Sequence, residues 1–290
     1  MADRVPLLLD TDIGSDIDDA LALAYLLRRP DCDLLGITTV TGDVAKRAAL
    51  CHLLCEAAGR KDIPIHAGAS RVLLAGPGQP DVPHYDAVRH RPHNLDWPVA
   101  TAVEFMRRTI RARPGEVTLL SIGPLTNVAL LFATDPEAAG LLKCWVSMAG
   151  AFGSAGDRDA EWNSACDPLA TSIAFAAGLE HRHIPLDVTL QCSISAADDR
   201  ATFKGELLNV VLEMAEVWFE KRDHIVLHDP LAAMTVFRPD LCGYRRGRVR
   251  VESTTGKTSF VQDESGPDEV ALDVDAAAAL EEFLSIFDWQ

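Results

Sequence analysis

Residues 5–24 read VPLLLDTDIGSDIDDALALA, and this stretch decides the fold class of the chain. The apolar run from Val5 to Asp10 predicts a short buried strand. The apolar positions between Asp18 and Arg28 predict a helix that follows almost at once. A buried strand that leads into a helix is the first half of a βαβ unit, so we expect an α/β protein.

The same alternation of strands and helices continues to the end of the chain. Strands are expected at 33–40, 63–66, 117–122, 144–149, 183–187 and 269–274, and a hairpin is expected from 248–251 and 259–261. Helices are expected at 44–58, from 125 onward, and at 167–177, 203–219 and 276–287. Residues 68–98 hold many of the Gly, Pro and His residues and predict a long loop region.

This order of elements predicts a mainly parallel, doubly wound sheet flanked by helices. Because the sequence shows no internal repeat and no low-complexity linker, we expect a single domain over residues 1–290. Ligands of such sheets bind at the carboxyl ends of the strands. The first strand ends at aspartates, so a site is expected there.

The overall charge of the chain limits its partners. The formal net charge is −16 and the pI is about 4.9. An acidic surface repels nucleic-acid polymers and anionic membranes, so we expect neither as a partner.

The apolar run at the N-terminus is too short for a signal peptide or a membrane span. Seven cysteines without a CxxC pair indicate reduced thiols in a cytoplasmic protein.

Five aspartates lie between the first strand and the first helical turn: Asp10, Asp12, Asp16, Asp18 and Asp19. A solvated acidic loop is the simplest alternative. Carboxylates packed together raise one another's pKa unless a cation neutralises them. The N-terminus of a helix stabilises an anion by only about 1 kcal/mol. Since oxygen ligands suit Ca²⁺ or Mg²⁺, the pattern favours a site for a hard divalent cation.

Two other motifs contain aspartates at similar spacing. An EF-hand loop needs Gly at its sixth position and Glu at its twelfth, and counting from Asp10 those positions hold Ser15 and Leu21. A phosphate-transferring Asp-x-Asp motif, with Asp10 as nucleophile and Asp12 as acid, stays open. That chemistry needs a lysine and further acidic residues, and the sequence offers no clear partner motif for it.

Seven segments along the chain resemble the inosine–uridine nucleoside hydrolase family, in the family's order. They are DTDIGSDIDDA (10–20), GITTVTGD (36–43), SIGPLTNVAL (121–130), MAGAFG (148–153), AEWNSACDP (160–168), PLDVT (185–189) and HDPLA (228–232). The resemblance covers nearly the whole chain. It implies the nucleoside hydrolase fold and a Ca²⁺-dependent enzyme that hydrolyses ribonucleosides to ribose and free base. It also implies a cytoplasmic homo-oligomer, a dimer or tetramer, that acts on small-molecule nucleosides in purine or pyrimidine salvage.

The resemblance implies a set of calcium ligands. Asp12 is similar to the aspartate that binds calcium and also acts as general base on the metal-bound water. Asp19 resembles the bidentate ligand, and Asp229 resembles the last carboxylate ligand. Ile122, just before Gly123, matches the residue whose backbone carbonyl binds the ion.

The resemblance also implies how the substrate is held. Asp18, Glu161 and Asn163 look like the ribose-binding residues, and His228 matches a histidine proposed in some members to assist the leaving base. The chemistry agrees, because a cation lowers the pKa of water and a carboxylate takes its proton. An anionic pocket stabilises the oxocarbenium-like transition state of glycoside cleavage, and an imidazole suits a departing base.

The chain departs from the family pattern in several places. Two extra residues precede Asp18, so Asp16 is either an additional ligand or a residue that supports the ligands. Asp43 replaces an asparagine that is common in the family near the metal. Asp157 stands where an asparagine often contacts the 5′-hydroxyl, and an acid there disfavours a 5′-phosphate, so nucleosides are expected over nucleotides. The family's His-Gly-x-Asp-Gly-Leu loop is not recognisable in residues 84–97.

Three functions compete at this point: a ribonucleoside hydrolase, an N-ribosyl hydrolase acting on a modified or non-standard nucleoside, and a non-catalytic metal-binding homologue. The joint presence of a general base, metal ligands and a leaving-group donor favours catalysis. Elsewhere in the sequence, Trp145 and Trp162 are expected in the core. His84, His90 and His93 are expected to contact the base or to lie at the surface.

Overall fold

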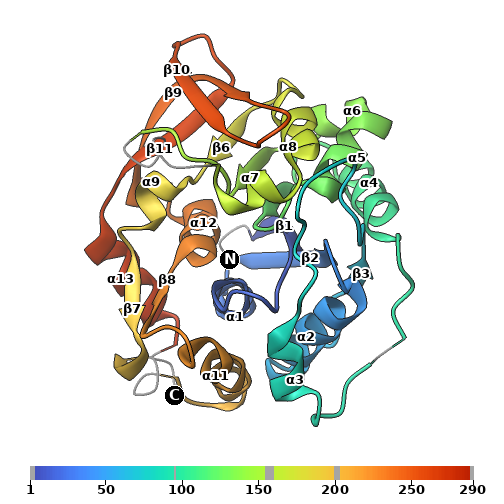
Figure 1. Cartoon of the computed structure of the whole chain (residues 1–290), viewed down its shortest axis with the longest axis vertical. Coiled ribbons are helices and arrows are strands. Elements are labelled where there is room, and N and C mark those ends of the chain that lie inside the picture. The colour runs from blue at the N-terminus through green and yellow to red at the C-terminus, as the bar shows by residue number, and fades with distance from the viewer. Residues whose placement is uncertain (1–3, 95, 154–159, 199–202, 288–290) are drawn as a thin grey trace.

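The structure is a computed structural model that describes residues 4–94, 96–153, 160–198 and 203–287. In this part of the chain a nine-stranded sheet runs through the molecule, with helices on both faces (Figure 1). Its strands are β1 (Val5–Thr11), β2 (Cys32–Thr39), β3 (Ile65–Ala67), β4 (Thr118–Ser121), β5 (Cys144–Ser147), β6 (His181–His183), β9 (Cys242–Val251), β10 (Thr258–Gln262) and β11 (Asp268–Val274). A separate ribbon pairs β7 (Ser193–Ser195) with β8 (His224–Val226).

The strand order of the large sheet is β10-β9-β11-β6-β5-β4-β1-β2-β3. All neighbours from β3 to β11 are parallel, and β9 is antiparallel to both β11 and β10. The predicted mainly parallel sheet and the predicted hairpin are therefore confirmed. The hairpin of β9 and β10 projects at the top of Figure 1.

The helices connect these strands. They are α1 (Asp18–Arg28), α2 (Val44–Ala57), α3 (Pro83–Val88), α4 (Ala102–Ala112), α5 (Thr126–Thr134), α6 (Pro136–Gly140), α7 (Trp162–Cys166), α8 (Pro168–Phe175), α9 (Leu186–Thr189), α11 (Glu206–Phe219), α12 (His228–Phe237) and α13 (Ala276–Ser285), with a 3₁₀ turn at Pro239–Leu241. The helices α1, α2, α11, α12 and α13 pack into one apolar core, and α4, α5 and α8 pack into a second.

The first strand shows why both faces of the sheet are covered. Successive side chains of a strand point to opposite faces. Leu7 and Leu9 accordingly belong to the core under α1, whereas Leu8 belongs to the core under α5. A strand buried on both sides has a continuous apolar run, which is what residues 5–9 show.

The position of β1 in the sheet also places the site. The chain proceeds from β1 to β2 and β3 on one side, and then crosses to β4, β5 and β6 on the other side. The connections that leave β1 and β4 at their carboxyl ends therefore diverge, which opens a crevice at the point where the strand order reverses. The aspartate-rich segment after β1 lies at this crevice.

Some predicted elements were wrong. The strand expected at 183–187 ends at His183, because Pro185 has no N–H for the ladder and a helical turn, α9, begins at Leu186. The expected loop at 68–98 contains the short helix α3. The helices α4 and α12 were not predicted. Of the eleven residues of α4 only three are buried, so its apolar stripe is thin.

The cysteines and the helix lengths bear on two other expectations. All seven cysteines are free thiols, and all except the partly buried Cys144 are buried, as expected for small core residues. Within the described residues, no helix combines the length and the apolar character that a membrane span requires.

Candidate active site

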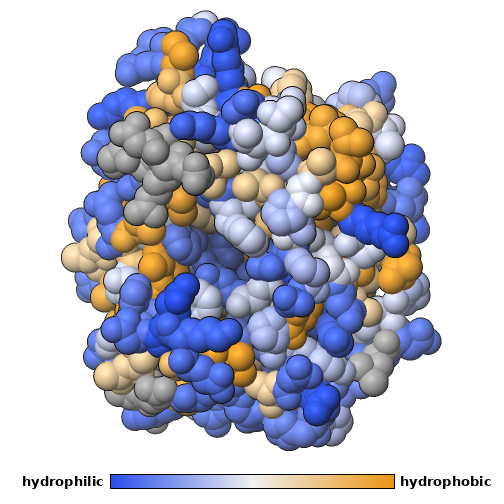
Figure 2. Space-filling view, viewed as in Figure 1, coloured by the Kyte–Doolittle hydropathy of each residue, from blue (hydrophilic) through white to orange (hydrophobic). Residues whose placement is uncertain are grey.

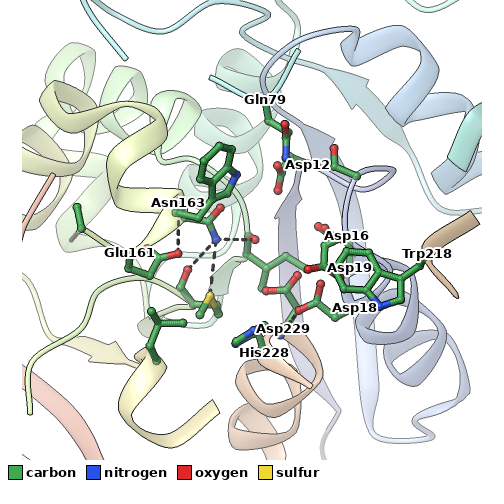
Figure 3. Close-up of a pocket in the computed structure, with 16 residues that line it drawn as sticks. Asp12, Asp16, Asp18, Asp19, Gln79, Glu161, Asn163, Trp218, His228 and Asp229 are labelled. Carbon is green, nitrogen blue, oxygen red and sulfur yellow. Dashed lines mark hydrogen bonds between the residues drawn. The ribbon is translucent and has the colours of Figure 1, made fainter. Parts of the chain in front are cut away.

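A pocket of about 600 Å³ opens at the carboxyl ends of the central strands (Figure 3). Figure 2 shows a hollow bordered mostly by hydrophilic residues on the face seen in Figure 1. The pocket is lined by Asp12, Ser15, Asp16, Asp18, Asp19, Gln79, Ile122, Met148, Ala160, Glu161, Trp162, Asn163, Leu186, Trp218, His228 and Asp229. Eight of the nine predicted site residues are in this set. The ninth, Asp157, lies outside the described residues.

Local hydrogen bonds shape the segment that follows β1. The Thr11 hydroxyl donates to Asp19 Oδ1 and accepts from the Ile13 amide at 3.1 Å. Gly14 has φ +120°, a backbone conformation that residues with a side chain rarely adopt. A Cβ at this position would lie 2.4 Å from the Val82 side chain. The segment is thus fixed at both ends, and the carboxylates around it are directed into the pocket.

Three carboxylates converge on one side of the pocket. Ligand oxygens of Asp18, Asp19 and Asp229 all lie within 4.8 Å of one another, and the three side chains are buried. Asp18 and Asp19 are the first two residues of helix α1, and Asp229 is the second residue of helix α12. The Asp229 amide donates to Asp18 Oδ2 at 3.1 Å, which holds the two helix starts together.

These three carboxylates strongly disfavour one another's charge. Burial raises the pKa of each well above its ordinary value, and repulsion from the neighbouring aspartates raises it further. Among the described residues that line the pocket, none is a lysine or an arginine. An oxygen-only donor set with excess negative charge fits a hard divalent cation, so this acidic group is able to hold a metal ion.

Asp12 lies in the same pocket but outside that close group of three. Burial raises the pKa of Asp12 to about 6, and the nearby Arg47 opposes the shift. Ile122 lines the pocket, and its carbonyl accepts a hydrogen bond of 3.1 Å from the Asn163 side chain. A carbonyl oxygen has two lone pairs, so Ile122 retains one for a cation.

Asp10 does not line the pocket. It is fully buried, and its Oδ1 accepts from Thr38 at 2.6 Å and from Asn127 at 2.8 Å. Burial raises its pKa to about 7. A carboxylate enclosed in this way cannot reach a substrate. This argues against the hypothesis of a phosphate-transferring motif in which Asp10 is the nucleophile.

Glu161 and Asn163 form the opposite wall, at the start of α7. Glu161 caps the helix, because its carboxylate accepts from the amides of Asn163 at 2.7 Å, Ser164 at 2.9 Å and Gly150 at 3.0 Å, and from the Ser164 hydroxyl. Only one of these four bonds ends on Oε1. Since a carboxylate oxygen has two lone pairs, Oε1 keeps acceptor capacity toward the pocket.

His228 lies beside the carboxylates, as its position before Asp229 requires. Its Nδ1 is 2.7 Å from the Thr189 hydroxyl. Burial lowers its pKa to about 4, so the imidazole is neutral at pH 7. If Nδ1 accepts from Thr189, Nε2 carries the proton and is free to donate it in a hydrogen bond.

Two aspartates that depart from the family pattern have different surroundings. Asp16 lines the pocket, and its Oδ1 accepts from the Ile17 amide at 2.6 Å. Asp43 does not line the pocket. It caps helix α2 by accepting from the Lys46 amide at 3.1 Å, and its side chain is 43% exposed.

Sequence reasoning misplaced or missed several residues. Trp145 is buried as predicted, but Trp162 is 52% exposed and lines the pocket, so its assignment to the core was wrong. His84 is buried, which contradicts both roles expected for it. Gln79 and Trp218 line the pocket and were missed. Trp218 stands near the end of an apolar helix pattern where a charged run begins, which is a usable signal, whereas Gln79 stands in a Gly- and Pro-rich loop without one.

Comparisons with known proteins agree with this geometry. The family model for inosine-uridine preferring nucleoside hydrolases matches residues 7–281. A uridine nucleosidase from Arabidopsis thaliana is 35% identical over 264 residues, which cover 85% of this chain and 78% of that protein. A non-specific ribonucleoside hydrolase, RihC, from Escherichia coli is 34% identical and covers 94% of both chains.

Solved structures share the fold. The plant nucleoside hydrolase PpNRh1 superposes with a TM-score of 0.83 at 25% identity, covering 99% of this chain and all of that one. An inosine-guanosine nucleoside hydrolase superposes with a TM-score of 0.85 at 23% identity, covering 99% of both chains. With the family model spanning nearly the whole sequence, the chain belongs to the inosine-uridine preferring nucleoside hydrolase family.

Proposed function

We propose that this protein hydrolyses the N-glycosidic bond of ribonucleosides, giving ribose and a free base, with Ca²⁺ as its metal. The observation that carries the proposal is the composition of the pocket. Buried carboxylates from the segment after β1 and from α1 and α12 face a carboxylate and an amide at the start of α7, and a neutral imidazole lies beside them. Family membership and the names of the relatives support the same activity.

The residues that would hold the ion are Asp12, Asp19, Asp229 and the carbonyl of Ile122, with Asp18 close enough to contribute. Calcium bound there would neutralise the carboxylates and lower the pKa of the attacking water. Calcium is preferred to magnesium because it accepts six to eight oxygen ligands in irregular geometry, and this pocket offers many carboxylate oxygens.

Asp12 is the proposed general base. Its carboxylate takes a proton from the water whose oxygen forms the new bond to C1′ of the ribose, while the bond from C1′ to the base nitrogen breaks. The bonding electrons leave with the base. Positive charge develops on the ribose in the transition state, and the surrounding carboxylates of Asp18 and Glu161 stabilise it.

Asp18, Glu161 and Asn163 are the proposed ribose-binding residues. Carboxylate oxygens accept from sugar hydroxyls, and the amide of Asn163 is oriented by its bonds to the carbonyls of Ile122 and Met148, both at 3.1 Å. His228 is the proposed donor to the leaving base. In the tautomer in which Nδ1 accepts from Thr189, the neutral imidazole donates a hydrogen bond from Nε2 to the base nitrogen on which negative charge accumulates.

The test is the release of reducing sugar from a panel of purine and pyrimidine ribonucleosides, with and without a calcium chelator. We expect turnover that the chelator abolishes and that added Ca²⁺ restores better than Mg²⁺. Asp43→Asn is the matched control, since asparagine also caps helices and Asp43 lies outside the pocket. Absence of turnover on every nucleoside, in a protein that still binds calcium, would favour the non-catalytic alternative.

A further inference from the structure

Arg47 is a fully buried arginine on helix α2, directly behind the aspartate segment. Its guanidinium donates to backbone carbonyls and one hydroxyl. The acceptors are the carbonyls of Thr41 (2.8 Å), Asp12, Ile13 (2.9 Å), Gln79 (2.6 Å) and Asp81 (3.4 Å), and Ser15 Oγ (3.2 Å). Among the described residues it forms no ion pair with a carboxylate. A buried cation whose hydrogen-bond acceptors are main-chain carbonyls and a hydroxyl is uncommon, because buried charges are ordinarily paired.

These acceptors belong to two separate walls of the pocket. Asp12 and Ser15 lie in the segment after β1, and Gln79 lies in the loop before α3. The Ser15 hydroxyl also donates to the Asp81 carbonyl at 2.9 Å, which ties the same two segments directly. Arg47 therefore joins chain segments that are more than sixty residues apart in sequence and that both face the pocket.

The third attachment of Arg47 lies on a strained residue. Thr41 has φ +62°, which is unfavourable for a residue with a β-branched side chain. Its carbonyl accepts from Arg47 Nε, and its hydroxyl accepts from the Gln79 amide at 2.9 Å. Such backbone conformations persist only where the surrounding structure fixes them. Here the two hydrogen bonds of Thr41 connect it to Arg47 and to the backbone of Gln79.

Gln79 itself faces the pocket near Asp12 (Figure 3). Within the described residues its side-chain amide has no hydrogen-bond partner, in contrast to the amide of Asn163, which is held by two carbonyls. A polar group that is fixed by its backbone and free at its side chain is suited to contact a ligand.

We propose that Arg47 is a positioning residue for the reaction, which sets Asp12 and Gln79 in place by clamping the two walls that carry them. The inference rests on the proposed function. The planar fork of arginine carries five donors, and lysine cannot reproduce it. Arg47→Lys keeps the positive charge and removes the fork, so it separates positioning from electrostatic effects.

The first test is hydrogen exchange on the whole protein without substrate. In Arg47→Lys we expect faster exchange in peptides covering both 12–16 and 78–82. Arg29→Lys is the matched control. Arg29 is also largely buried and bonds Asp31 and Glu282, but it lies at the opposite end of α1 from Asp18. Faster exchange in only one of the two segments, or an equal change in Arg29→Lys, would overturn the clamp.

The second test measures calcium binding by calorimetry and turnover of a nucleoside. Mutation of residues that orient metal ligands typically lowers metal affinity or activity about 10- to 100-fold. We expect kcat of Arg47→Lys to fall by that factor, with a smaller change in KM. Gln79→Ala combined with Arg47→Lys should lose less than the product of the two single losses, because the lysine variant has already released Gln79.

The outcomes separate the clamp from the proposed function. Multiplicative losses, or a loss of thermal stability with unchanged kcat per folded molecule, would overturn the positioning role. If the wild-type protein hydrolyses no nucleoside, the proposed function fails. The exchange and calcium-binding measurements then still decide whether Arg47 joins the two walls.

Discussion

Two groups of buried titratable side chains in the described part of the chain bring ligand-type atoms close together, and they differ in whether they line the active-site pocket. The carboxylates Asp18, Asp19 and Asp229 and the trio His181, His183 and Asp268 each bring their ligand-type atoms within 4.8 Å. The carboxylates repel one another and border a cavity. The trio lies between aromatic rings, with the Trp145 and His181 centroids 3.5 Å apart, and does not line that cavity.

The histidine trio is held by hydrogen bonds to its own members and to nearby protein groups. His183 Nε2 is 2.9 Å from Asp268 Oδ1, Asp268 Oδ2 accepts from the Val249 amide, and Ser147 Oγ is 2.7 Å from His181 Nε2. Burial lowers the pKa of both histidines, so each is neutral near pH 7. Their Nδ1 atoms have no partner in the described structure. Because Nε2 of His183 donates to the Asp268 carboxylate, Nδ1 of His183 is an unprotonated acceptor. Of the two buried groups, therefore, the one that marks a site is the one whose like charges face one another at a cavity.

The largest expected difference between the two groups is in turnover. Asp12→Asn removes the proposed base while keeping the shape of the side chain, and we expect kcat to fall by about 10²–10⁴-fold. Asp268→Asn makes the same chemical change in the trio and should leave kcat per folded molecule unchanged. Steady-state rates of both variants on one nucleoside decide the matter. Equal losses would show that the trio takes part in the reaction.

The next effect concerns the imidazole at the pocket. His228→Ala removes a donor to the leaving base, and the loss of such a donor costs about 10²–10³-fold in kcat. The loss should be far smaller on a p-nitrophenyl riboside, whose leaving group is stable as an anion. His183→Asn should affect neither substrate. A larger loss on the activated substrate than on the nucleoside would indicate that His228 maintains the site instead.

Calcium should stabilise the folded protein through the carboxylate group and not through the histidine trio. At a free concentration about 100 times its Kd, a ligand that binds only the folded state stabilises it by about 2.7 kcal/mol. We expect calcium to raise the melting temperature and a chelator to lower it again. Asp229→Asn should weaken this response and Asp268→Asn should retain it. A calcium response lost only in Asp268→Asn would move the metal site to the trio.

Disrupting the histidine trio should lower the free energy of unfolding and leave kcat unchanged. Asp268→Asn replaces the acceptor of His183 by a weaker one, and a buried hydrogen-bonding group left unsatisfied costs about 1–3 kcal/mol. Denaturant unfolding in saturating calcium measures this loss. A variant as stable as the wild-type protein would mean that water satisfies the buried imidazole.

The smallest effect is a pH dependence. Both histidines have folded-state pKa values below their ordinary value of 6.5, so below pH 6.5 the unfolded chain takes up protons first. Stability is therefore lost as pH falls from 6.5 toward the folded-state values, by up to about 1.4 kcal/mol per histidine and pH unit. His181→Gln should reduce this slope when unfolding is measured between pH 6.5 and 5.5 in saturating calcium. An unchanged slope would assign the effect to other groups.

The sequence predicted the first βα unit to within one residue, because β1 is buried on both faces and α1 on almost every side. It predicted the sheet class and the eight described site residues that line one pocket, because the family's motifs follow strand ends. It could not predict that Arg47 is buried, since the carbonyls that compensate it come from residues 12 to 81. Charged residues are ordinarily expected at the surface.

The bond between the Asp229 amide and Asp18 joins residues 211 positions apart. During synthesis from the N-terminus, β1 and α1 are complete long before α12 exists, so the pocket lacks one wall until the chain is nearly finished. Carboxylates brought together at that last docking step oppose it. A divalent ion therefore stabilises the chain only after α12 has docked. When the ion is scarce, newly made protein should fold slowly, and this should be seen at ion concentrations that still keep the mature protein folded.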